Sequence, residues 1–109
     1  MRRLHYAGGT VLLGDATCKA VLRYARALAE DDSSDVVTIP VLVEGAGFVD
    51  AHFLVGPASQ IYSTPADQGG PEPDDQEIVE RLEVATKRLQ PSRPDWYEEM
   101  PDLRGADGP

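Results

Sequence analysis

Two runs of β-branched and aromatic residues between residues 36 and 55 constrain the fold more than any other part of this chain. Valine and isoleucine recur at every second position in residues 36–43, and residues 48–55 show the same period. That period is typical of strands with one buried face. Gly45 and Gly47 supply the positive φ that a short connection requires. The sequence therefore predicts an antiparallel β-hairpin.

The register of this hairpin decides which of its side chains are buried. Facing residues of an antiparallel pair lie on the same side of the sheet. The two apolar rows meet if Val43 faces Gly47, across a three-residue loop, or Val49, across a five-residue loop. A slip of one residue would turn every side chain of one strand to the wrong face. The expected core row is Val37, Ile39, Val41, Val43, Val49, Ala51, Phe53 and Val55.

Pro40 interrupts the first of these two strands. Proline has no N–H to donate to a neighbouring strand, so it is found at sheet edges or at bulges. We therefore expect the strand that contains Pro40 to lie at an edge, or to be bulged, rather than to be central.

The opposite face of the hairpin is mixed and is the first candidate for a binding surface. Asp50 and His52 project from it in the same direction, with Cα atoms roughly 6.5–7 Å apart. Such a pair can share a metal ion or a proton, but a metal site needs more ligands and nothing in the sequence brings His5 close. We assign no catalytic residue and no metal ligand. Exposed apolar groups favour partner binding. The predicted partner-binding residues are Leu42, Phe48, Asp50, His52 and Leu54 on this face, together with Trp96 and Tyr97 of the C-terminal tail.

The segment before the hairpin predicts further strands and a helix. Two short apolar runs flank Gly8-Gly9, which indicates a tight hairpin or a single bent strand. Asp15 is the expected N-cap of a helix that ends near Glu30. Its apolar stripe should cover the buried face of the central hairpin, and consists of Cys18, Val21, Leu22, Ala25, Leu28 and Ala29.

Cys18 lies on this stripe. A free cysteine at such a position is usually a small buried apolar residue. Its place near a helix N-terminus leaves open a reactive thiol, because the helix dipole lowers a thiol pKa there.

The remaining chain completes an α+β fold. Gly56-Pro57 should turn the chain into a further strand. The predicted order is β(β)-α-β-β-β-α, a small antiparallel sheet of three to five strands with a helix packed on one face. We divide the chain into an α+β core (1–63), a Pro/Gly/Asp-rich linker (64–74), a second amphipathic helix (75–89) and an extended Pro-rich acidic tail (90–109). The second helix packs either on the sheet of its own domain or against a partner chain.

Charge limits the partners that we expect. The formal net charge is −9, which disfavours nucleic acid and anionic membranes because both require phosphate neutralisation. The chain has one cysteine, no apolar run long enough to span a membrane and no secretory pattern, so we expect a cytoplasmic protein.

These observations lead to one main functional hypothesis and two alternatives. The main hypothesis is a non-enzymatic protein–protein interaction module, regulatory or accessory, that forms a homodimer and uses no cofactor. The first alternative is a small metal-binding protein or enzyme that uses Asp50 and His52. The second is an acidic inhibitor that mimics nucleic acid.

Overall fold

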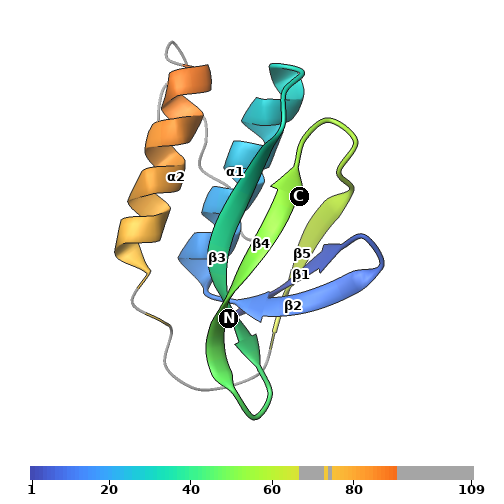
Figure 1. The fold of residues 1–109 in the computed structure, drawn as a ribbon, viewed down its shortest axis with the longest axis vertical. Helices are drawn as coiled ribbons and strands as arrows, with labels where there is room; N and C mark the ends of the chain where they lie inside the picture. Colours follow the sequence, from blue (N-terminus) through green and yellow to red (C-terminus); the bar gives the residue numbers. More distant parts are fainter. Residues whose placement is uncertain (67–72, 74, 91–109) are drawn as a thin grey trace, which may run out of the picture.

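The structure of the chain, a computed structural model, describes residues 1–66, 73 and 75–90. It contains one five-stranded antiparallel sheet and two helices (Figure 1), so the α+β prediction is confirmed. The elements are β1 (Arg2–Tyr6), β2 (Gly9–Leu13), α1 (Asp15–Glu30), β3 (Asp35–Val43), β4 (Gly47–Val55), β5 (Ile61–Pro65) and α2 (Gln76–Leu89). The strand order is β4-β3-β2-β1-β5. The chain therefore follows the order of elements that the sequence predicts, with β1 and β2 as a hairpin.

The β3–β4 hairpin adopts the three-residue loop. Val43 pairs with Gly47, and Gly45 and Gly47 have φ values of 82° and 75°. Most of the expected core row is buried, but Val43 and Val49 are 41% and 39% exposed. Figure 1 shows why: the end of the hairpin extends beyond both helices. The prediction that these two valines belong to the core is therefore wrong.

Pro40 lies in β3, which has β4 on one side and β2 on the other. The prediction that this strand lies at an edge of the sheet is therefore wrong. The register explains how the sheet accommodates it. β3 pairs with β2 at Leu12 and Leu42, and continuing that antiparallel register would place Pro40 opposite Gly14, which precedes α1. Strand β2 ends at Leu13, one residue before that position. Pro40 thus lies where the second side of β3 has no strand partner.

The N-terminal hairpin turns through Ala7 and Gly8, whose φ values are 53° and 82°. Two successive positive φ values match the right-handed twist of the flanking strands. The N-cap of α1 is Gly14, which makes no side-chain cap bond, so the predicted cap at Asp15 is off by one residue. Asp15 instead begins the first turn, where its charge is favourable to the helix dipole, and it lies 3.7 Å from the Met1 ammonium.

Helix α1 is buried on more than one stripe because it contacts both the sheet and α2. Its buried residues therefore include some outside the predicted stripe: Thr17, Cys18, Ala20, Val21, Tyr24, Ala25, Ala27 and Leu28. Of the predicted stripe, Leu22 is half-buried and Ala29 is exposed, so the inclusion of Ala29 is wrong.

Helix α2 packs alongside α1 of its own chain, and the two helices run in the same direction (Figure 1). Three polar contacts follow the interface from start to end: Thr17–Asp75, Arg23–Glu83 and Glu30–Gln90. Leu82 is buried with the core. Helix α2 therefore packs on its own domain, but the prediction that it packs on the sheet is wrong because its main neighbour is α1.

Candidate functional site

The sheet has a second face that carries the predicted binding residues. In the described part of the chain, the helices pack on the face that includes Leu4, Ile39 and Phe53, and α1 lies behind β3 in Figure 1. Strand pairing places the alternate side chains of all five strands on the opposite face, which we call the open face. It consists of Arg3, His5, Thr10, Leu12, Val36, Thr38, Pro40, Leu42, Phe48, Asp50, His52, Leu54, Tyr62 and Thr64.

Five of the seven predicted site residues lie together on this face. Leu42 faces Phe48 across the β3–β4 ladder, and Asp50, His52 and Leu54 follow along β4. The other two, Trp96 and Tyr97, lie outside the described residues.

The Asp50–His52 pair shows no further ligand in the described ranges. His52 shares a hydrogen bond of 2.8 Å between its Nδ1 and the Thr38 hydroxyl. His5 lies on β1, separated from β4 in the sheet by β2 and β3, and its ring stacks on Tyr62 with centroids 4.2 Å apart. Within residues 1–66, 73 and 75–90, no three histidine, cysteine, aspartate or glutamate side chains gather as metal ligands.

Exposed apolar side chains are concentrated on the β3–β4 hairpin. Of the seven large apolar residues that are exposed among those described, five belong to these two strands: Val36, Val43, Phe48, Val49 and Leu54. Sequence reasoning found two of them, Phe48 and Leu54, as site residues. It missed Val43 and Val49 because they continue the periodic core row, and periodicity does not say where the covering helix stops.

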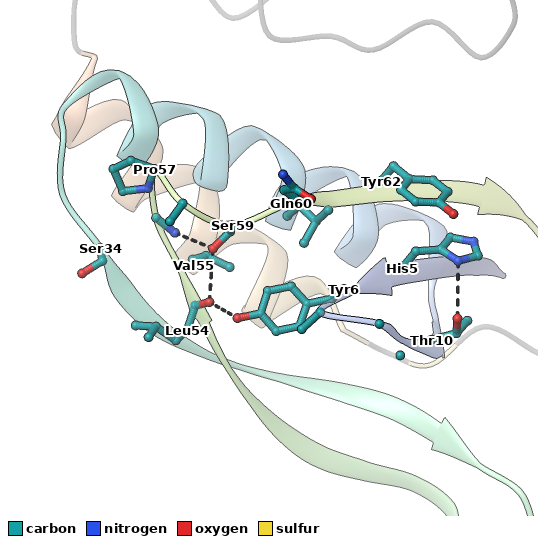
Figure 2. A pocket seen from close by; sticks show the side chains of 16 residues that line it. His5, Tyr6, Thr10, Ser34, Leu54, Val55, Pro57, Ser59, Gln60 and Tyr62 are labelled. Atoms are coloured by element: carbon teal, nitrogen blue, oxygen red, sulfur yellow. Dashed lines mark hydrogen bonds between the residues drawn. The ribbon is translucent and has the colours of Figure 1, made fainter.

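An open pocket of about 800 Å³ lies at the end of the sheet where β4, β5 and the β1–β2 turn approach one another (Figure 2). Of the predicted site residues, only Leu54 lines it among those described. Its polar lining comes from His5, Tyr6, Thr10, Ser34, Ser59, Gln60 and Tyr62. Sequence reasoning missed this pocket because it joins residues some 50 positions apart, although the Gly8-Gly9 and Gly56-Pro57 turns mark its two rims.

Several polar groups of the pocket are occupied by internal bonds. The Tyr6 hydroxyl donates to the Leu54 carbonyl, which also accepts from Ser59 Oγ at 3.4 Å. Ser59 Oγ in turn accepts from the Gly56 N–H at 3.0 Å, and Figure 2 shows these bonds. Ser59 thus closes the turn after β4. No Asp, Glu, Lys or Arg is among the described residues that line the pocket.

Cys18 is fully buried in α1. Burial raises the pKa of its thiol, and this effect exceeds the lowering by the Ser63 hydroxyl and the Arg2 guanidinium. A buried thiol with a raised pKa is a poor nucleophile. The interpretation of Cys18 as a small core residue is therefore confirmed.

Comparison with known proteins identifies no relative for this chain. No family model matches it, and neither the curated proteins nor the solved structures contain a match. No helix among the described residues is both long and apolar enough to cross a membrane. A functional conclusion therefore rests on the residues of the chain itself.

Proposed function

We propose that this protein is a non-enzymatic interaction module that binds protein chains through its β3–β4 hairpin, and that a second copy of the chain is one such partner. The concentration of exposed apolar side chains on this hairpin carries the proposal. Burying a large apolar side chain is worth about 1.5–3 kcal/mol. Phe48, Val49 and Leu54 are 38%, 39% and 57% exposed, so a partner that covers them gains part of that value from each side chain, about 2–4 kcal/mol together.

Charge supports a protein partner rather than a nucleic acid. The hairpin, residues 35–55, contains three acidic residues and neither lysine nor arginine. A nucleic-acid surface requires basic side chains that neutralise phosphates. An apolar surface with few charges at its centre is instead typical of protein interfaces.

The two alternative functions have less support. The Asp50–His52 pair has no third ligand among the described residues. A nucleic-acid mimic needs rows of carboxylates, and on the described open face Asp50 is the one carboxylate.

A pair of matched substitutions tests the proposal. Val49→Asp places a charge on the hairpin, whereas Val84→Asp places the same charge at an exposed valine of α2. The wild-type chain of 11.8 kDa should elute as a dimer in size-exclusion chromatography with light scattering. Val49→Asp should elute as a monomer and Val84→Asp as a dimer. A wild-type chain that stays monomeric up to about 100 μM would overturn the self-association.

A further inference from the structure

Strand β4 is an edge strand of the sheet, and every second residue of it directs its backbone N–H and C=O groups away from β3. Among the described residues it pairs only with β3. The Leu54 carbonyl points away from β3, because it accepts hydrogen bonds from Tyr6 and Ser59. In an antiparallel ladder, every second residue directs both its N–H and its C=O to the same side. His52, Asp50 and Phe48 therefore also present their backbone groups to the free edge.

The sequence of β4 is complementary to itself about Ala51. Read outward from Ala51, His52 mirrors Asp50, Phe53 mirrors Val49 and Leu54 mirrors Phe48. Each mirrored pair joins two apolar residues or a carboxylate and an imidazole. Such pairs are the favourable combinations across neighbouring strands.

We propose that two copies of the chain associate through their β4 edges, antiparallel about a twofold axis at Ala51. This inference rests on the proposed function, since it names the partner and the register of that same hairpin. On the open face, Asp50 of each copy faces His52 of the other. On the helix side, Val49 of each copy faces Phe53 of the other, and the two Ala51 residues meet on the axis.

The neighbouring registers are less favourable. The residues of one copy that direct their N–H and C=O groups to the free edge must pair with the same kind of residue in the other copy. One strand can therefore shift along the other only in steps of two residues. One neighbouring register sets Asp50 against Asp50, and like charges directly opposite each other are destabilising. Another sets the two His52 residues face to face and pairs Asp50 with Leu54. Only the register about Ala51 gives both carboxylates an imidazole partner.

Details of the strand agree with this register. On the side of the axis nearer the hairpin loop the residues are exposed, from Gly47 to Asp50, and His52 is exposed beyond it. Ala51 on the axis is half-buried and Phe53 is buried. Thr38 engages Nδ1 of His52, which leaves Nε2 to meet the carboxylate of the second copy. The Leu54 carbonyl is already bonded to Tyr6 and Ser59, so the ladder between the copies does not extend to Leu54. The two Asp50–His52 pairs form the centre of this ladder and contribute about four backbone hydrogen bonds.

Cysteine substitutions test the register directly. Ala51→Cys should form a disulfide between copies under mild oxidation, because residues that meet on the axis in a non-hydrogen-bonded pair have Cα atoms about 4.5 Å apart. Val49→Cys is the matched control: its two copies would lie four residues apart along the ladder, roughly 13 Å, and should not cross-link. The native Cys18 is buried, so it should not compete with the introduced cysteine. Non-reducing electrophoresis and thermal melting report cross-linking and folding.

Exchange of the charged pair gives a second test. His52→Asp sets Asp50 of each copy against the introduced aspartate of the other, and should weaken dimerisation about tenfold. Adding Asp50→His restores an aspartate–histidine pair in this register and should restore the affinity. In the register with His52 against His52, the double variant would stay weak.

The outcomes separate the register from the proposed function. A wild-type dimer in which Ala51→Cys folds but does not cross-link, or in which the exchange does not restore affinity, would overturn the register while self-association stands. A wild-type chain that does not associate at all would overturn both.

Discussion

Tyr24 links α1 to the first residue of the β3–β4 hairpin, and this link should make stability depend on alkaline pH. Its hydroxyl donates a hydrogen bond of 2.5 Å to Oδ2 of Asp35. Burial, the hydrogen bond to Asp35 and the charge of that carboxylate together raise the pKa of Tyr24 from 10 to about 12. Each effect favours the protonated tyrosine in the folded state.

The sign and size of the effect follow from linkage. Below pH 10 both the folded and the unfolded chain keep the proton, so the stabilisation is fully present. As pH rises from 10 to 12, the unfolded chain loses the proton first, and the stabilisation from Tyr24 is lost. The two pKa values imply a loss of about 1.3 kcal/mol between pH 9 and pH 11.

The comparison with Tyr24→Phe isolates this contribution, since phenylalanine has no proton to lose. Urea unfolding of both proteins at pH 9, 10 and 11 gives their free energies of unfolding. The wild type should be more stable at pH 9, by about 1.5–3 kcal/mol for a hydrogen bond to a charged group. That difference should shrink by about 1.3 kcal/mol at pH 11. A difference that stays constant would refute the proposed role of the Tyr24–Asp35 contact.

Two further predictions concern other parts of the fold. Gly56→Ala should lower the free energy of unfolding by about 1–3 kcal/mol, because its new Cβ would lie 2.8 Å from Cβ of Ser34; Gly9→Ala, with its nearest contact at 3.6 Å, is the control, and equal effects in chemical denaturation would contradict this reasoning. Cys18 should react with a thiol reagent only on unfolding, and labelling of the native protein at the rate of an exposed thiol would contradict its burial.

The periodic patterns of the sequence predicted which side chains share a face of the hairpin, because a strand alternates its side chains regardless of what surrounds it. They did not predict how far the helices extend along the hairpin, so Val43 and Val49 were wrongly assigned to the core. The predicted N-cap at Asp15 was off by one residue because glycine and aspartate are both favoured at the N-cap of a helix. No local pattern indicated that β5 pairs with β1 rather than with β4, since that choice depends on contacts far apart in the chain.

For the candidate site, too, the sequence predicted which side chains share a face of one strand, but not how distant segments come together. Period two placed Phe48, Asp50, His52 and Leu54 together on one face. The free edge of β4 is a property of the strand order, and the pocket beside Leu54 is a property of the chain's return through residues 56–60, so neither could be derived from one segment alone.

The two edges of the sheet differ in a way that supports an interface at β4. Natural proteins protect edge strands by making them short or by placing proline and charged residues on them. β5 has five residues and ends at Pro65. β4 has nine residues, contains no proline and carries Asp50 as its one formal charge. Between Phe48 and His52 the free edge of β4 faces no strand among those described, which makes it a template for a further strand. In the proposed dimer, the charge that would discourage a second copy is the one that His52 of that copy can neutralise.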